Sequence, residues 1–437
     1  MQLKNEVNHY VIRNTAASAG MSMYLLIDTL FISIAAGPLG LTALNVALPL
    51  FSLFNCLGML LGVGGAAYYS LNKIEHPERV HSTYSELMIF GVLLGLLITL
   101  LIEVFIHPLI YFLGGSPQTY RLTHTYISII AFCAPLYIAN YLSVNFIRND
   151  NHPNLTMVAT LTETSSVLII DWFFIFGLGL KMEGAAMATI FSPLCSLLIL
   201  SHHRHFANRQ LSLYWVKPRL QTIRNATQLG LAAGINELSN GFAVFIFNII
   251  LLRIAGNYAI AAYGIISNIA LISVALANGV ALGVQPITSR EYGIRHYENV
   301  KKAFWQGLKI TIGIGLTVLI ILTVFRSQVI SLFNYQHQTT MAQYATTGVP
   351  IYFSGAIFIN ANILMVLFLT SIRSARSAFA LSLLRGYLIL APVTFILGFT
   401  AGINGVWAAV PLTELIVSIL SAGIIYHRFK HFSPLNN

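Results

Sequence analysis

Residues 84–106 read YSELMIFGVLLGLLITLLIEVFI, and this stretch decides the fold class. Its only charged residues are Glu86 and Glu103, near the two ends. A helix crosses the bilayer core, about 30 Å thick, with roughly 20 apolar residues. We therefore expect the stretch to cross a membrane as an α-helix. A transmembrane β-strand is excluded, because such strands alternate apolar and polar residues over about ten positions.

The chain contains eleven further stretches of this kind, two before residues 84–106 and nine after them, separated by polar and Gly/Pro clusters. The twelve predicted spans lie near 14–36, 42–70, 84–106, 122–147, 155–180, 183–203, 225–254, 259–288, 304–325, 341–370, 377–400 and 404–427. The prediction is an all-α integral membrane protein.

The composition agrees with this fold class. Hydrophobic residues make up 56% of the 437 residues and charged residues 9%, against roughly 25% charged residues in soluble domains. A soluble enzyme, a disordered chain and a secreted disulfide scaffold are thereby excluded. Cys56, Cys133 and Cys195 lie inside apolar stretches and are interpreted as packing residues. The first residues lack the short apolar core of a cleavable signal peptide.

The distribution of Lys and Arg sets the expected orientation. Eighteen of these residues fall in the N-terminus, the even-numbered loops and the C-terminus, and four fall in the odd-numbered loops. Because cytoplasmic loops carry the excess of positive charge, both termini are expected in the cytoplasm. The same rule accounts for the net charge of +10 without a nucleic-acid partner.

The two halves of the chain resemble each other. Gly58-x-x-x-Gly62 corresponds to Gly279-x-x-x-Gly283 with a shift of 221 residues. The other matches, at shifts of 220 or 221, are His76-x-Glu78-x-Val80 with His296-x-Glu298-x-Val300, Phe174–Gly177 with Phe395–Gly398, and Gly184 with Gly405.

A repeat of six spans has a definite consequence for the architecture. An even number of spans returns each half to the same side, so the halves are expected as two six-helix bundles related by a pseudo-two-fold axis along the membrane normal. The expected lobes are residues 1–203 and 225–437, joined by a cytoplasmic linker at 204–224. The small-xxx-small pairs, including Gly91/Gly95 and Gly230/Gly234, are interpreted as close helix contacts.

The linker region, residues 201–224, has five Lys or Arg and no acidic residue. It is interpreted as a topological anchor that touches anionic lipid head groups. His202, His203 and His205 form a second, weaker hypothesis, a metal site, which lacks a defined set of partner ligands.

Five acidic residues fall within predicted spans, namely Asp28, Glu163, Asp171, Glu237 and Glu414. A charged carboxylate at the bilayer centre costs about 2.5–3.5 kcal/mol even on the lenient insertion scale, so these residues are expected to face protein or water. No Lys or Arg lies near the centre of a span, so the expected partner is a proton, a metal cation or a cationic ligand. This pattern favours an ion-coupled carrier of positively charged molecules.

Neutral polar residues lie at similar depth. Those assigned to substrate binding, together with Glu163 and Glu237, are Asn45, Tyr137, Asn140 and Asn240; interhelical hydrogen bonding is the alternative role. The sequence contains no H-E-x-x-H, G-x-x-x-x-G-K-[ST] or G-x-S-x-G motif. We therefore expect a transporter driven by an ion gradient, and neither an enzyme nor an ATPase.

Several segments resemble the multidrug and toxic compound extrusion (MATE) transporters, in particular their bacterial multidrug exporters. They are Leu25–Phe31, Leu44–Pro49, Ile170–Gly179, Glu183–Thr189, Ala262–Asn268, Gly283–Pro286, Ala378–Arg385 and Gly405–Pro411. The similarity covers nearly the whole chain and has the same twelve-span, two-lobe layout.

The resemblance implies a cation-coupling site at Asp28, Asp171 and Thr189. The family's asparagine in the fifth span is Val167 here, and Na⁺ requires several oxygen ligands whereas a proton requires one carboxylate. This departure favours proton coupling. Sodium remains the alternative, with Asp28 and Asp171 as its ligands, and Glu237 resembles the family's acidic residue in the seventh span.

The expected function is therefore a cation-coupled antiporter, driven by H⁺ or Na⁺, that exports organic cations by alternating access. No cofactor beyond the coupling ion is expected. The expected partners are small lipophilic cations and the lipid bilayer, the expected location is the bacterial cytoplasmic (inner) membrane, and the expected state is a monomer. The alternative is a lipid-linked oligosaccharide flippase of the wider superfamily, whose cleft should hold arginines for pyrophosphate.

Overall fold

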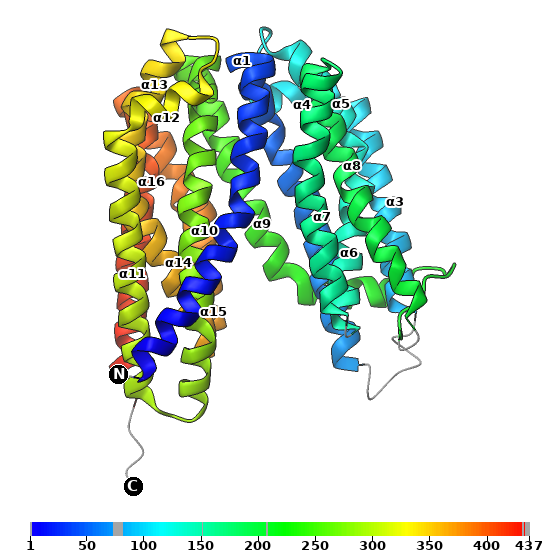
Figure 1. The fold of residues 1–437 in the computed structure, drawn as a ribbon, viewed down its shortest axis with the longest axis vertical. Coiled ribbons are helices and arrows are strands. Elements are labelled where there is room, and N and C mark those ends of the chain that lie inside the picture. Colours follow the sequence, from blue (N-terminus) through cyan, green and yellow to red (C-terminus); the bar gives the residue numbers. More distant parts are fainter. Residues whose placement is uncertain (1, 73–81, 151, 207–208, 431, 433–437) are drawn as a thin grey trace. The chain divides into compact units, whose positions relative to one another are not determined.

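The computed structural model describes residues 2–72, 82–150, 152–206, 209–430 and 432, and within these ranges it contains helices and no strands (Figure 1). The helices in chain order are α1 (Gln2–Asn72), α3 (Thr83–Val104), α4 (Ile106–Phe112), α5 (Tyr120–Ala131), α6 (Cys133–Asn149), α7 (Pro153–Trp172), η1 (Phe173–Gly177), α8 (Lys181–Ser201), η2 (His202–His205), α9 (Leu220–Ala255), α10 (Asn257–Gly293), α11 (Tyr297–Val324), α12 (Arg326–Phe333), α13 (Thr339–Phe353), α14 (Ala356–Ser371), α15 (Ala375–Leu383), η3 (Leu384–Leu388) and α16 (Leu390–Lys430).

The described helices give the predicted number of membrane spans. Eight helical stretches are long and apolar enough to cross a membrane, or ten if the bent pairs α5–α6 and α13–α14 each count as one span. Two of these stretches contain a further break, at Gly37 and at Gly402, and dividing them there gives twelve. The all-α, twelve-span prediction is confirmed.

The breaks at Gly37 and Gly402 have a simple backbone cause. Gly37 has φ 64° and ψ −161°, and Gly402 has φ 60° and ψ −143°. These angles are open to glycine because it lacks a Cβ. Pro38, which follows Gly37, also lacks the N–H that would continue the helical hydrogen bonds. Each glycine therefore ends one span and starts the next without an intervening loop.

The internal repeat is visible in the irregularities of the helices. The fourth span of each half is bent, by 45° between α5 and α6 and by 47° between α13 and α14. The fifth span of each half contains a π-helical turn, η1 after α7 and η3 after α15. A π-turn inserts a residue into the helical ladder and is frequent at functional sites. The bends follow Ala131 and Phe353, 222 residues apart, close to the shift of the sequence repeat, whereas η3 starts 211 residues after η1. The corresponding bends therefore support duplication of a six-span element.

The chain folds into two compact units. Unit 1 comprises Met1–Leu30 and Ile249–Asn437, and unit 2 comprises Phe31–Asn248. The first arm of α1 therefore belongs to unit 1, and most of α9 belongs to unit 2. The lobe boundaries expected from the sequence, 1–203 and 225–437, stay a prediction.

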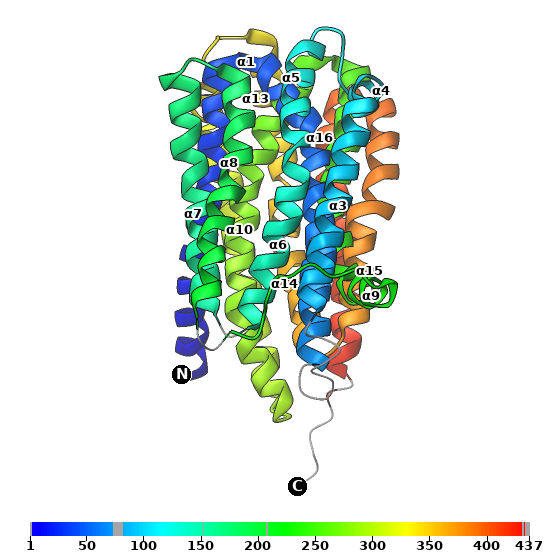
Figure 2. The same ribbon diagram turned by 90° about the vertical axis from the view of Figure 1, so that its right-hand side faces the viewer.

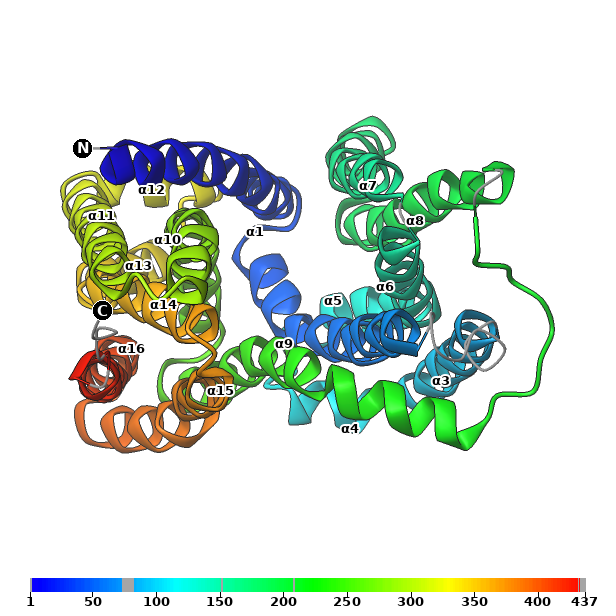
Figure 3. The ribbon, with the colours of Figure 1, turned by 90° about the horizontal axis from the view of Figure 1, so that it is seen from below.

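In unit 1 the beginning of α1 packs against α10 (Figure 3). Val7 and Val11 are buried in one apolar cluster with Ala277 and Val280 of α10. Gly283 allows this approach, because a Cβ added there would lie 2.7 Å from the α-carbon of Val11. The second half of the Gly279-x-x-x-Gly283 motif therefore serves helix packing.

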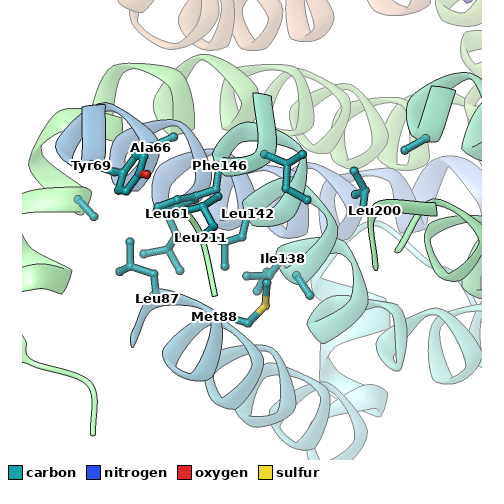
Figure 4. Close-up of a cluster of buried hydrophobic side chains, with 14 residues drawn as sticks. Leu61, Ala66, Tyr69, Leu87, Met88, Ile138, Leu142, Phe146, Leu200 and Leu211 are labelled. Atoms are coloured by element: carbon teal, nitrogen blue, oxygen red, sulfur yellow. The ribbon is translucent and has the colours of Figure 1, made fainter. Parts of the chain in front are cut away.

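In unit 2 helix α7 runs along α8 (Figure 2), and an apolar core forms where α1, α3, α6 and the linker meet (Figure 4). Two predicted glycine contacts are confirmed. A Cβ on Gly95 would lie 2.4 Å from the α-carbon of Pro135, and one on Gly230 would lie 2.0 Å from the Leu60 carbonyl oxygen. Helix α9 thus lies against the second arm of α1 with its backbone in direct contact.

The linker is attached to unit 2 by buried groups. Arg219 donates to Glu86 from its backbone N–H at 3.1 Å and from Nε at 2.8 Å, and Glu86 is fully buried. Leu211 is buried in the core that Figure 4 shows. The predicted contact with lipid head groups stays a prediction for the exposed residues of the linker. One of these, Trp215, is 88% exposed.

Candidate functional site

Glu163 and Asn140 form the first polar pair within the spans of unit 2. Glu163 lies half-buried on α7, and Asn140 on α6 is 4% exposed. Asn140 Nδ2 donates to Glu163 Oε2 at 2.9 Å. The Asn140 Oδ1 atom is buried and has no hydrogen-bond partner within the described residues. The pair therefore presents an amide oxygen and a carboxylate side by side.

Glu237 and Asn55 form a second pair of the same kind. Glu237 on α9 is half-buried and accepts a hydrogen bond from Asn55 Nδ2 of α1 at 3.2 Å. The Asn55 Oδ1 atom is also buried, and no described residue bonds to it. Both residues lie within predicted spans, Asn55 in 42–70 and Glu237 in 225–254. The sequence does not indicate their pairing, since they lie 182 residues apart.

Asp171 is the most buried acid of the predicted coupling set. It is the penultimate residue of α7, two positions before the start of η1, and is 1% exposed. Val167, one turn earlier on the same helix, is half-buried. Thr189 on α8 is half-buried too, and its hydroxyl donates to the Ala185 carbonyl at 3.0 Å.

Asp28 lies half-buried on the first arm of α1. It belongs to unit 1, whereas Asp171 and Thr189 belong to unit 2. The coupling set of Asp28, Asp171 and Thr189 thus draws on both units and stays a prediction.

The other predicted substrate residues differ in exposure. Asn45 is fully buried in α1, where its Nδ2 donates to Leu41 O and its own backbone oxygen accepts from Asn248 Nδ2, both at 2.9 Å. Tyr137 on α6 is half-buried with its ring centroid 6.2 Å from that of Phe51. Asn240 on α9 is exposed. Asn45 therefore fixes helix contacts, while its Oδ1 has no partner among the described residues.

Glu414 corrects one expectation from the sequence, namely that the acids within spans lack basic partners. Arg385, inside η3, donates to Glu414 Oε1 through Nε. Asn362 of α14 donates to the other carboxylate oxygen at 2.7 Å. The side chain of Arg385 is 27% exposed and that of Glu414 is 7% exposed. Arg385 lies within the predicted span 377–400, so a basic residue at membrane depth pairs with Glu414 and makes it part of a structural ion pair in unit 1.

Two surface hollows on the described part of the chain lie away from these residues. One, of about 670 Å³, lies on α15 and α16 of unit 1 beside His427 and Arg428, and the other lies on the outer face of α7 around Leu161 and Ile169. Neither hollow is lined by a predicted site residue.

Comparison with known families assigns the chain. The MatE family model matches residues 15–173 and 233–421. The chain belongs to the MatE family. The MATE resemblance inferred from the sequence is thereby confirmed.

Relatives of this MatE protein have been named and solved. It is 24% identical over 419 residues to the multidrug export protein MepA of Staphylococcus aureus (strain N315), covering 92% of this chain and 89% of that protein. Among solved structures, the inward-facing conformation of a multidrug resistance MATE family transporter of the MOP superfamily has a TM-score of 0.87 at 20% identity, covering 95% of this chain and 96% of that one. The MATE multidrug transporter DinF-BH has a TM-score of 0.75 at 22% identity, with 97% and 95% coverage. The MatE chain thus has the two-lobe MATE fold.

Proposed function

We propose that this MatE protein is a cation-coupled antiporter that exports organic cations, including diverse drugs, by alternating access. The observation that carries the proposal is the pairing of Glu163 with Asn140 and of Glu237 with Asn55. In each pair a carboxylate within the spans is held by a neutral amide and not by Arg or Lys. The names of the relatives, MepA and DinF-BH, support multidrug export.

The charge of these pairs indicates the charge of the cargo. An amide donor orients a carboxylate but does not compensate its negative charge. A bound cation would supply the positive charge that an arginine would otherwise provide. The Oδ1 atoms of Asn140 and Asn55, which no described residue bonds, add hydrogen-bond acceptors for N–H donors of the same cation. Glu414 is excluded from this role because Arg385 already neutralises it.

We assign coupling to Asp28, Asp171 and Thr189, with H⁺ as the preferred ion. Val167 stands where the family asparagine would supply a neutral oxygen, and a proton needs only a carboxylate. If the ion is Na⁺, Asp28 and Asp171 are its ligands. In either case ion binding at the carboxylates and drug binding oppose each other, and this negative linkage makes exchange obligatory.

The transport cycle follows from that linkage. The outward-open protein takes up the coupling ion, which weakens drug binding and releases the drug outside. The ion-loaded protein then reopens inward, where cytoplasmic drug displaces the ion. We further propose a monomer in the bacterial cytoplasmic membrane with both termini in the cytoplasm, as the distribution of Lys and Arg supports.

The test is ethidium transport by the purified protein in proteoliposomes. Asp171→Asn should abolish export against a gradient while expression stays intact, and collapse of ΔpH at fixed sodium should stop wild-type export. Val167→Asn restores the family oxygen and should increase the dependence on sodium. Undiminished coupled export by Asp171→Asn contradicts the coupling role, and export that follows sodium after ΔpH is collapsed reverses the choice of ion.

A further inference from the structure

Three buried groups of unit 2 converge where the linker leaves α8. Asp150 lies between α6 and α7, His152 is the residue before α7, and His203 lies in η2. They are 1%, 9% and 6% exposed, respectively. One potential ligand atom from each lies within 4.8 Å of the other two. The histidine cluster suspected in the sequence is thus divided, because His203 turns inward while its neighbour His202 is exposed.

The two imidazoles are oriented by defined hydrogen bonds. The Nδ1 atom of His152 lies 2.7 Å from the backbone oxygen of Asp150, so Nδ1 carries the proton in this contact. Metal-bound histidines are usually oriented in this way, with the other ring N–H donated to a carbonyl or carboxylate. His203 Nε2 lies 3.0 Å from Asp150 Oδ2.

The carboxylate of Asp150 is held by the linker and by α1. Its Oδ2 accepts from the backbone N–H of Gln210 at 2.9 Å and of Leu211 at 3.4 Å, and its Oδ1 accepts from the Tyr69 hydroxyl at 3.4 Å. These hydrogen bonds fix the position of the carboxylate between the linker, η2 and α1.

We propose that Asp150, His152 and His203 bind one divalent transition-metal ion, of which Zn²⁺ is the best match. Two imidazole nitrogens and one carboxylate oxygen suit Zn²⁺, which takes four ligands and often includes water. They do not suit Ca²⁺ or Mg²⁺, which prefer oxygen ligands. The Phe206 ring, 4.5 Å from that of His152 between centroids, partly covers the group.

The proposed metal joins segments far apart in the sequence. It connects the α6–α7 turn to the end of α8, and through Asp150 to the N–H groups of the linker at 210–211. Its role is to fasten the linker to unit 2, and it is separate from the cation-coupling residues. An ion-free hydrogen bond between His203 and Asp150 is the competing state, and the test distinguishes the two.

The test is Zn²⁺ binding to the full chain, purified without a polyhistidine tag and stripped with a chelator. Titration calorimetry should give one Zn²⁺ per chain. His152→Ala and His203→Ala should each weaken binding on the order of 100-fold, since even loss of an outer-shell partner costs about 10–100-fold. His202→Ala, an exposed histidine on the same turn, is the matched control and should leave the affinity unchanged.

X-ray absorption of the Zn²⁺-loaded wild type removes the dependence on variants that fail to fold. The expected first shell contains nitrogen and oxygen at about 2.0–2.2 Å with the scattering of two imidazoles. The proposal is overturned if the folded wild type binds no stoichiometric Zn²⁺. It is also overturned if His203→Ala binds as wild type does, or if the shell contains fewer than two imidazoles.

Discussion

Replacement of Arg385 by leucine should destabilise unit 1, because it leaves the Glu414 carboxylate buried without its cation. Glu414 keeps only the hydrogen bond from Asn362 Nδ2 at 2.7 Å, and its side chain is 7% exposed. Breaking a buried ion pair by removing one partner costs about 3–5 kcal/mol. The low end, about 3 kcal/mol, applies because Arg385 is itself 27% exposed. For a unit of this size that free energy corresponds to a melting temperature lower by about 6 °C.

The opposite substitution should cost less. Glu414→Gln keeps an acceptor for Asn362, and the long side chain of Arg385, already 27% exposed, can turn its charged group further outward. We expect a loss of about 1–2 kcal/mol. The double variant Arg385→Leu/Glu414→Gln should be more stable than the sum of the single losses predicts, since it contains no unpaired buried charge.

Thermal unfolding followed by fluorescence-detected gel filtration gives the four melting temperatures of this cycle. Arg376→Leu, which removes an exposed arginine from α15, is the control for the loss of a positive charge and should stay within about 0.5 kcal/mol of wild type. Arg385→Leu with the stability of Arg376→Leu, or single effects that add in the double variant, would refute the ion-pair argument.

Two further predictions concern other contacts within the units. Gly230→Ala should lower the melting temperature, because its Cβ would lie 2.0 Å from the Leu60 carbonyl oxygen and overpacking costs about 1–3 kcal/mol; Gly313→Ala, with open space around it, should instead stabilise α11 by up to about 1 kcal/mol. Equal shifts for these two variants would contradict the packing. Hydrogen bonds from Arg290 lower the pKa of Glu6, so this contact stabilises above the unfolded pKa of about 4.5 and is lost as pH falls through the folded value. Glu6→Gln should therefore lose less stability than wild type between pH 7 and pH 4, seen as a smaller decrease in melting temperature. The difference in the free energy of unfolding should be at most about 1 kcal/mol for so exposed a pair. An equal decrease in both proteins would exclude the contact.

The spans could be predicted because lipid imposes one requirement on all of them. A backbone in hydrocarbon must satisfy its own hydrogen bonds, so a long apolar run has to be a helix. The break at Gly37 could also be predicted, because the Gly37-Pro38 pair interrupts the apolar pattern. The π-turns η1 and η3 could not be predicted, because their residues, FFIFG and LRGYL, are also typical of regular apolar membrane helices.

The hydrogen-bond partners of the polar residues were harder to predict from the sequence than their location within spans. The sequence placed Glu237 and Asn55 within spans, but the hydrogen bond between them joins residues 182 positions apart, and helical periodicity carries no information across that separation. The partner of Glu414 was missed for a different reason. The expectation that no Lys or Arg lies near the centre of a span overlooked Arg385, which lies within the predicted span 377–400 and, in the structure, inside η3.

The interpretation of the linker was affected in the same way, because its partners also lie far away along the chain. The basic linker region was interpreted as a surface that contacts lipid, because a count of Lys and Arg treats every positive charge as unpaired. Arg219 and His203 are instead directed toward Glu86 and Asp150, acids that the fold has already buried and that lie far away along the chain. A buried carboxylate is costly unless paired. His203 is therefore buried beside Asp150, and Arg219 pairs with the buried Glu86 while its own side chain stays 51% exposed. The same selection, applied to the five acids within spans, separates Glu414, which has an arginine, from Glu163 and Glu237, which have amides and on which the transport proposal rests.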